Sequence, residues 1–146
     1  MYVWYRDWET NNLVTMTSST TDFFAFKVYS FQGSLTTDAL EGTGTFSGTT
    51  TNAAFSITSA FDNCLFVDAI ATDYSTNTPT VPTRDGYTVT WNSSIQESHA
   101  TSYILKIGST GAKTYEMPIN SSRSCVYVGA TFNCLEQGGS FLYNLI

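Results

Sequence analysis

Charged side chains are scarce in this sequence. They make up 12% of its 146 residues, which is about half the usual share for a soluble domain. The net charge is −6, and only six residues are Lys or Arg. Nucleic acids and anionic membrane surfaces both attract clustered cations, so the composition argues against either as a partner. Ser, Thr and Asn have to supply the solubility, as they commonly do on extracellular and virion proteins.

Long apolar runs are also missing. The run "FFAFKVYSF" at 23–31 is interrupted by Lys27 and is shorter than the roughly 18 residues that a membrane-spanning helix needs. The N-terminus, "MYVWYRDWE", has no basic region followed by an apolar stretch, so no signal peptide is predicted. We expect either assembly without secretion, which favours a virion, or a leader that has been removed.

Histidine is nearly absent, and this bears on catalysis. His99 is the only histidine, and neither a G-x-S-x-G nor a Cys/His signature accompanies it. We therefore interpret it as a surface or structural residue. The sequence also has no C-x-x-C pair, no calcium-binding loop and no glycine-rich phosphate loop. We expect a protein that is not an enzyme and that uses no metal, nucleotide or other cofactor.

Alternation is what the sequence does have. In 23–31 the residues Phe24, Phe26 and Val28 fall on one face of an extended chain, and Lys27 and Tyr29 fall on the other. Aromatic and β-branched residues at a period of two predict a strand. Both faces are largely apolar, so this strand is expected to lie centrally or beneath a partner.

Similar runs predict roughly nine short strands, joined by turns rich in Gly, Pro, Asn and Asp. They lie near 2–8, 12–17, 23–32, 52–59, 64–73, 86–91, 100–107, 113–117 and 124–133. No window has helical periodicity, and no linker interrupts the chain. The pattern predicts an all-β fold, an antiparallel β-sandwich formed by a single domain spanning 1–146. For "EGTGTFSGTTTN" at 41–52 a flexible surface loop is the favoured interpretation, and an edge strand centred on Phe46 is the alternative.

Four motifs follow one another in this pattern: "VYSFQGS" at 28–34, "LFVDAIAT" at 65–72, "SYILKI" at 102–107 and "VYVGATF" at 126–132. Their order resembles a widespread set of β-sandwich surface domains in environmental phage, bacterial and archaeal proteins. The first is similar to an S-Y-S-G element, altered here by "FQ", and the second to a strand ending in V-D-A. The resemblance implies a jelly-roll-like sandwich with a structural role at a surface. Similar domains carry further strands before the first aromatic segment, which leaves two alternatives: an incomplete sandwich, or one that a neighbouring subunit completes.

The N-terminal strand is the candidate for contact between subunits. Its apolar residues are Tyr2, Val3, Trp4, Tyr5 and Trp8. An apolar strand of this kind can add to the open sheet edge of a neighbour. We therefore expect a structural assembly subunit, either a capsid decoration or fibre protein at the virion surface or part of an extracellular filament, whose partners are copies of itself or other structural subunits. The alternative is a carbohydrate-binding or adhesion module, in which exposed aromatic residues bind surface glycans.

Asp68 is the most unusual acidic residue, because it shares a strand face with Phe66 and Ile70. A buried carboxyl group needs partners or loses its charge. The favoured interpretation is a structural hydrogen bond to the backbone or to a Tyr or Trp donor. The alternative is a ligand for a cation or a sugar.

Two further sets of residues could be modified. Asn92 and Asn120 begin N-x-S triplets in predicted loops and are candidate N-glycosylation sites, which would make the protein a glycoprotein. The three cysteines allow at most one intrachain bridge. Cys125 and Cys134 bracket one predicted strand, which separates them by about 30 Å, so they should not pair. If the strands at 64–73 and 124–133 are antiparallel, Cys64 and Cys134 can form the disulfide; a parallel pair would favour Cys64 and Cys125. Three reduced, buried thiols are the remaining alternative.

Overall fold

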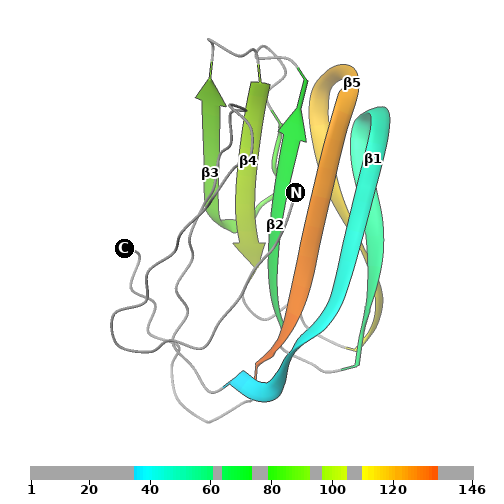
Figure 1. Cartoon of the computed structure of the whole chain (residues 1–146), viewed down its shortest axis with the longest axis vertical. Coiled ribbons are helices and arrows are strands. Elements are labelled where there is room, and N and C mark those ends of the chain that lie inside the picture. The colour runs from blue at the N-terminus through cyan, green and yellow to red at the C-terminus, as the bar shows by residue number, and fades with distance from the viewer. Residues whose placement is uncertain (1–34, 61–63, 74–78, 93–96, 105–109, 135–146) are drawn as a thin grey trace, which may run out of the picture.

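The computed structural model describes residues 35–60, 64–73, 79–92, 97–104 and 110–134, and five strands lie in these ranges. They are β1 (Leu35–Ser59), β2 (Leu65–Thr72), β3 (Asp85–Asn92), β4 (Glu97–Ile104) and β5 (Gly111–Cys134). The strands form one antiparallel sheet in the order β1-β5-β2-β4-β3 (Figure 1). The all-β, antiparallel prediction is therefore confirmed for this part of the chain. The strands predicted at 2–8, 12–17 and 23–32 lie outside the described residues.

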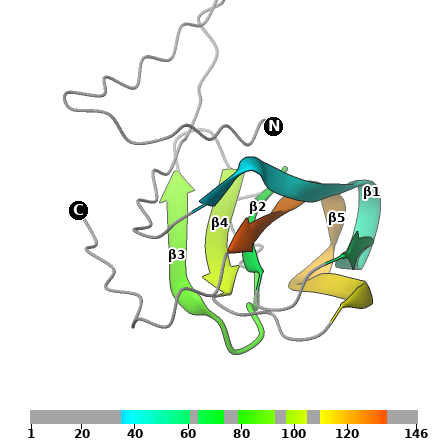
Figure 2. The same ribbon diagram turned by 90° about the horizontal axis from the view of Figure 1, so that it is seen from below.

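β1 and β5 are far longer than the sequence pattern predicts, with 25 and 24 residues. Each joins two segments that were predicted as separate elements. The turn expected between the strands predicted at 113–117 and 124–133 lies inside β5. The pairing moves from Thr50 opposite Arg123 to Asn52 opposite Pro118, so β5 has extra residues where the pair bends. Figures 1 and 2 show both ribbons turning back at this point, so that the β1–β5 pair curls over the rest of the sheet.

The main core lies inside this curl. Phe55 and Tyr115 come from the curled halves of β1 and β5, and Phe66 and Tyr127 come from the flat part of the sheet. The rings of Phe66 and Tyr115 are stacked with their centroids 3.7 Å apart, and the centroids of Phe55 and Tyr127 lie 4.6 Å apart. Because aromatic side chains bury large areas, this cluster is the main apolar contact between the curled and flat parts.

The segment 41–52 is a strand, so the prediction of a flexible surface loop was wrong and the edge-strand alternative is correct. Along it, exposed Thr43, Thr45, Ser47 and Thr49 alternate with half-buried residues that face the core, three of which are glycines. Phe46 is partly buried and packs against the core. The loop interpretation failed because it counted each glycine as a turn residue. Gly42, Gly44 and Gly48 in fact lie at alternate positions, on the same face of the strand as Phe46.

Glycine is required here by the close approach of Phe55. Gly44 of β1 lies directly opposite Gly129 of β5. A Cβ atom on Gly44 would overlap the ring of Phe55, and one on Gly129 would lie 2.7 Å from both Phe55 Cζ and Phe66 Cε2. The two glycines thus form a slot in the sheet that admits the Phe55 ring from the curled layer.

Gly44→Ala is expected to destabilise the protein by about 1–3 kcal/mol, because an overpacked core forces side chains or backbone to shift. Thr45→Ala is the matched control, since Thr45 is exposed on the neighbouring position of the same strand. The measurement is urea unfolding followed by circular dichroism. Phe55→Leu in the Gly44→Ala background should recover part of the loss, and equal midpoints for Gly44→Ala and Thr45→Ala would contradict the slot.

Candidate functional site

Asp68 lies at the centre of a buried polar network. It sits in the middle of β2, between Ser102 of β4 and Gly129 of β5, and it is 1% exposed. Its Oδ1 atom accepts hydrogen bonds from the Ser102 backbone N–H at 2.9 Å and from the Ser102 hydroxyl group. Its Oδ2 atom accepts one from the Tyr127 hydroxyl at 2.7 Å. The prediction of a structural hydrogen bond to the backbone or to a Tyr or Trp donor is confirmed, and both a backbone donor and a tyrosine are present.

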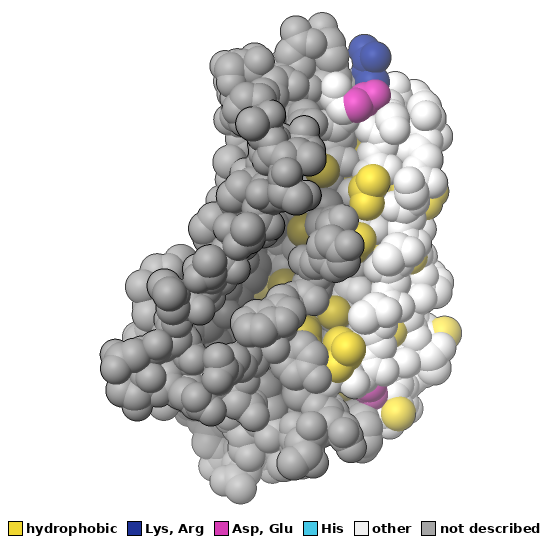
Figure 3. All heavy atoms as spheres, in the orientation of Figure 1, with side chains coloured by type: hydrophobic (Ala, Val, Ile, Leu, Met, Phe, Trp, Pro, Cys, Tyr) yellow, Lys and Arg dark blue, Asp and Glu magenta, His cyan; other side chains and the backbone are white. Residues whose placement is uncertain are grey.

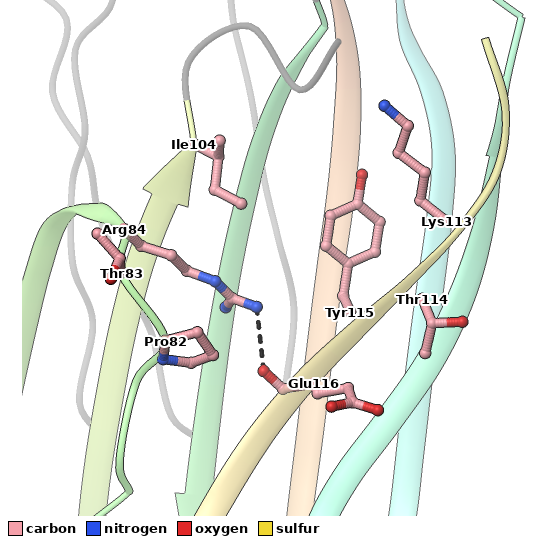
Figure 4. A pocket seen from close by; sticks show the side chains of 8 residues that line it. All are labelled: Pro82, Thr83, Arg84, Ile104, Lys113, Thr114, Tyr115 and Glu116. Atoms are coloured by element: carbon pink, nitrogen blue, oxygen red, sulfur yellow. Dashed lines mark hydrogen bonds between the residues drawn. The ribbon is translucent and has the colours of Figure 1, made fainter. Parts of the chain in front are cut away.

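Arg84, just before β3, neutralises this carboxylate. Its Nη1 atom forms an ion pair with Asp68 Oδ2, and the arginine side chain is only 5% exposed. Nη2 donates to the Glu116 carbonyl oxygen at 3.0 Å, as Figure 4 shows, and the guanidinium carbon lies 5.5 Å from the centre of the Phe66 ring. Arg84 therefore joins the flat part of the sheet to the curled half of β5. The sequence analysis did not single out Arg84, because it lies in "TRDG", residues 83–86, a composition typical of a turn.

The protonation of the network follows from its burial. Burial raises the pKa of the Asp68 carboxyl, while the hydrogen bonds from Ser102, the charge of Arg84 and the Tyr127 hydroxyl act in the opposite direction. Burial and the nearby Asp68 raise the pKa of the Tyr127 hydroxyl. Tyr127 therefore keeps its proton at neutral pH and acts as a hydrogen-bond donor, not as a general base.

A groove opens beside Arg84, between the approach to β3 and the curled half of β5 (Figure 4). Its volume is about 480 Å³. It is lined by Pro82, Thr83, Arg84, Ile104, Lys113, Thr114, Tyr115 and Glu116. The lining contains no serine, cysteine or histidine, and burial raises the pKa of Tyr115 to about 12, so the groove offers no activated nucleophile of these types.

A second polar cluster, centred on Glu41, lies at the connection between β1 and β2. Oε1 of Glu41 accepts a hydrogen bond from the Ala60 backbone N–H at 2.5 Å. Oε2 accepts hydrogen bonds from the Ser59 hydroxyl and the Cys64 thiol, both at 2.8 Å. The carboxylate thus holds the end of β1 against the start of β2, and its partners give it a structural role.

Of the other residues singled out in the sequence, some lie away from the Asp68 network and some lie outside the described residues. His99 is half-buried on β4 and, by strand alternation, faces away from Asp68. Asn92 is the last residue of β3, and Asn120 is exposed within β5, so both lie in strands and not in the predicted loops. N-glycosylation at these two residues stays a prediction. The predicted inter-subunit strand, from Tyr2 to Trp8, lies outside the described residues.

Comparisons with known proteins give no relative. No protein-family model matches the chain, and neither a curated protein nor a solved structure matches it. The resemblance to β-sandwich surface domains therefore stays a prediction. Within the described ranges, no group of three His, Cys, Asp or Glu side chains could hold a metal ion. The same ranges contain no helix with the length and apolar character needed to cross a membrane.

The strand register narrows the choice of disulfide partners. β2 and β5 are antiparallel, with Leu65 opposite Phe132 and Thr72 opposite Cys125. Cys64 therefore lies near the end of β5 that carries Cys134, as the preferred pairing requires. Cys125 lies at the other end of β2, which removes the basis for a Cys64–Cys125 bridge. Cys125 and Cys134 belong to the same strand, as predicted.

Cys64 and Cys125 are buried, unbridged thiols in this structure. A Cys64–Cys134 disulfide, with Cys125 as a thiol, stays a prediction for oxidising conditions. The test is peptide mapping without reduction, after alkylation of the unfolded protein. A reduced and alkylated sample serves as the control. Three alkylated cysteines would show that the bridge does not form, and a Cys64–Cys125 peptide would contradict the strand register.

Arg84→Met is expected to cost about 3–5 kcal/mol at pH 7, because it leaves the Asp68 carboxylate buried without its cation. Losing the cation raises the folded-state pKa of Asp68 further above that of the unfolded chain. A raised folded-state pKa favours the folded state at low pH, and this contribution is lost as pH rises. The stability deficit of the variant should therefore grow from pH 4 to pH 7 in urea titrations.

Lys113→Met is the matched control. Lys113 lines the same groove as Arg84, but its charge does not contribute to the pKa shift of Asp68. This variant should show a small deficit that does not grow with pH in this way. Adding Asp68→Leu to Arg84→Met should recover stability, since no buried charge then remains. A deficit of Arg84→Met that is the same at both pH values would contradict the role assigned to the ion pair.

Proposed function

We propose that this protein is a non-enzymatic structural subunit that assembles through an edge of its sheet. Its setting is the virion surface, as a capsid decoration or fibre protein, or an extracellular filament. The observation that carries the proposal is the edge formed by β1. β1 is one of the two edge strands of the described sheet, and its pairing within the described part of the chain is with β5 alone.

The β1 edge lacks the usual protection against pairing with another strand. Natural proteins protect exposed edges with charged residues, prolines or very short strands. Residues 42–59 of β1 contain no charged residue and no proline, although the strand bends near Thr50. Figure 3 likewise shows a mostly uncharged surface on the described part of this side of the molecule. Such an edge is suited to receive the backbone of an added strand.

The N-terminal strand, Tyr2–Trp8, is our candidate for the added strand, donated by a neighbouring copy. Its aromatic residues alternate, so one face would pack on the acceptor while the other covers it. We also propose that the complete domain is a jelly-roll-like β-sandwich. In it the curled halves of β1 and β5 belong to a second layer.

A structural role also agrees with the chemistry of the buried polar groups. The Asp68 carboxylate forms an ion pair with Arg84 and accepts hydrogen bonds from Ser102 and Tyr127. The Glu41 carboxylate accepts a hydrogen bond from the backbone that follows β1. Each group holds strands together, and burial with these partners leaves neither carboxylate directed at a substrate. The alternative function is a glycan-binding or adhesion module. It requires exposed aromatic residues that stack on sugars, and Trp91 of β3 is a candidate.

Thr45→Lys is expected to weaken assembly, because a charged side chain on an edge strand opposes pairing with a second chain. Ser122→Lys is the matched control, since it adds the same charge at an exposed position of β5, away from the β1 edge. Electron microscopy and light scattering of the purified proteins should show particles or fibres for the wild type and for Ser122→Lys. Thr45→Lys should remain smaller, with an unchanged circular dichroism spectrum.

Deleting residues 1–8 tests the proposed donor and should give the same loss of assembly as Thr45→Lys. Wild-type protein that stays monomeric and binds glycans would overturn the proposal in favour of an adhesion module. Assembly of Thr45→Lys at the wild-type level would show that the β1 edge is not used.

A further inference from the structure

Tyr115 lines the groove beside Arg84 with a hydroxyl group that no described residue uses. The residue is 5% exposed, and its ring stacks on Phe66 with the centroids 3.7 Å apart, which fixes the direction of the hydroxyl. The hydroxyl makes no hydrogen bond with the residues that the structure describes. A buried hydroxyl without a partner is costly, and native proteins contain few of them. This one is therefore suited to a partner that enters the groove.

Arg84 also keeps an unused donor at the groove. A guanidinium group has five N–H donors, and this side chain is 5% exposed. Its Nη1 atom serves the Asp68 network, and its Nη2 atom donates to the Glu116 carbonyl oxygen. The Nε–H group has no acceptor within the described ranges. The groove thus holds two buried side chains, from different strands of the fold, that can each donate to a ligand.

The charges around the groove favour an anion. Lys113 is half-buried and lies two residues before Tyr115, so the two share a face of β5. Figure 4 shows the Lys113 ammonium group and the Tyr115 hydroxyl pointing to the same end of the groove, across from Arg84 and Ile104. Glu116 is exposed, and its carboxylate points away from Arg84 while its carbonyl oxygen faces it (Figure 4). The one acidic side chain of the lining is therefore turned away from the donors.

We propose that the groove binds the carboxylate group of a small organic acid whose body is apolar. A carboxylate accepts several hydrogen bonds and carries the charge opposite to that of Lys113. Pro82 and Ile104 supply an apolar wall for the rest of the acid. The groove volume, about 480 Å³, is typical of small-molecule sites. The site is independent of the proposed assembly, because none of its lining residues belongs to β1.

The Tyr115 hydroxyl is a donor over the whole neutral range. Burial raises the pKa of Tyr115 to about 12, so the group keeps its proton and can donate it to a bound carboxylate. The groove has no activated serine, cysteine or histidine among its lining residues. The arrangement therefore supports binding of the acid without a chemical step.

Equilibrium dialysis with radiolabelled benzoate tests the proposal on the full chain, whether or not the chain assembles. Benzoate joins a carboxylate to an apolar ring, and benzamide is its neutral counterpart. The wild type should bind benzoate saturably and benzamide about tenfold more weakly. Lys113→Met should weaken benzoate binding by about tenfold, because a hydrogen bond between charged groups is lost. Arg123→Met is the matched control, since it removes a cation from an exposed position of β5 outside the groove, and it should bind benzoate as the wild type does.

Tyr115→Phe separates binding from stability. It should weaken benzoate binding by about tenfold and leave the urea midpoint unchanged, since the lost hydroxyl has no partner among the described residues. Tyr127→Phe is the matched control for stability. It should lower the urea midpoint, because the Tyr127 hydroxyl donates to the buried Asp68 carboxylate.

The proposal would be overturned by a lack of saturable benzoate binding, by equal binding of benzamide and benzoate, or by equal benzoate binding in Lys113→Met and Arg123→Met. A urea midpoint for Tyr115→Phe as low as that for Tyr127→Phe would show that the hydroxyl is structural. Tighter binding of glucuronate than of benzoate would contradict an apolar body for the acid.

Discussion

The approach of Phe55 to the Gly44–Gly129 pair is the contact on which the rest of the structure depends. A ring can lie this close to a sheet only where two strands both lack a side chain at the same point. The curled halves of β1 and β5 then come near enough for Tyr115 to stack on Phe66. With any larger residue at these positions the two parts would be held further apart, and the main core would contain voids that well-packed interiors do not have.

The ion pair between Arg84 and Asp68 is also connected to the curled part of the fold. Arg84 reaches the Asp68 carboxylate in the flat part of the sheet and the Glu116 carbonyl oxygen in the curled part. Burying two charges is costly, and the attraction between them offsets the cost only when the remaining donors and acceptors are also paired. Ser102 and Tyr127 complete this pairing. The network therefore favours this packing of the curled part on the flat part. Another packing could bury as much apolar surface, but it would leave these charges and hydrogen-bonding groups unpaired.

The faces and edges of this sheet have different chemical character, which bears on how the protein could act. The main core is apolar and closed, the opposite face of the flat part of the sheet carries buried side chains such as Leu65 and Phe132, and the β1 edge is uncharged over residues 42–59. An uncharged edge offers backbone hydrogen bonds without the repulsion that keeps most edges apart. In a chain of low overall charge, association through backbone pairing is thus physically easier than association through charge complementarity.

The sequence by itself determined the strands and much of their local chemistry. Period-two alternation located β2, β3 and β4 close to their observed positions, because a strand's two faces meet different surroundings whatever its partners are. It also identified Asp68 as a buried acid that needs a partner, with the backbone or a Tyr or Trp donor as the favoured one. The tertiary structure alone explained the glycines of the segment at 41–52. Gly44 makes room for the ring of Phe55, which comes from the other half of β1, beyond the bend. The tertiary structure alone also brought Arg84 to Asp68, since the two residues lie on different elements, one just before β3 and the other in β2.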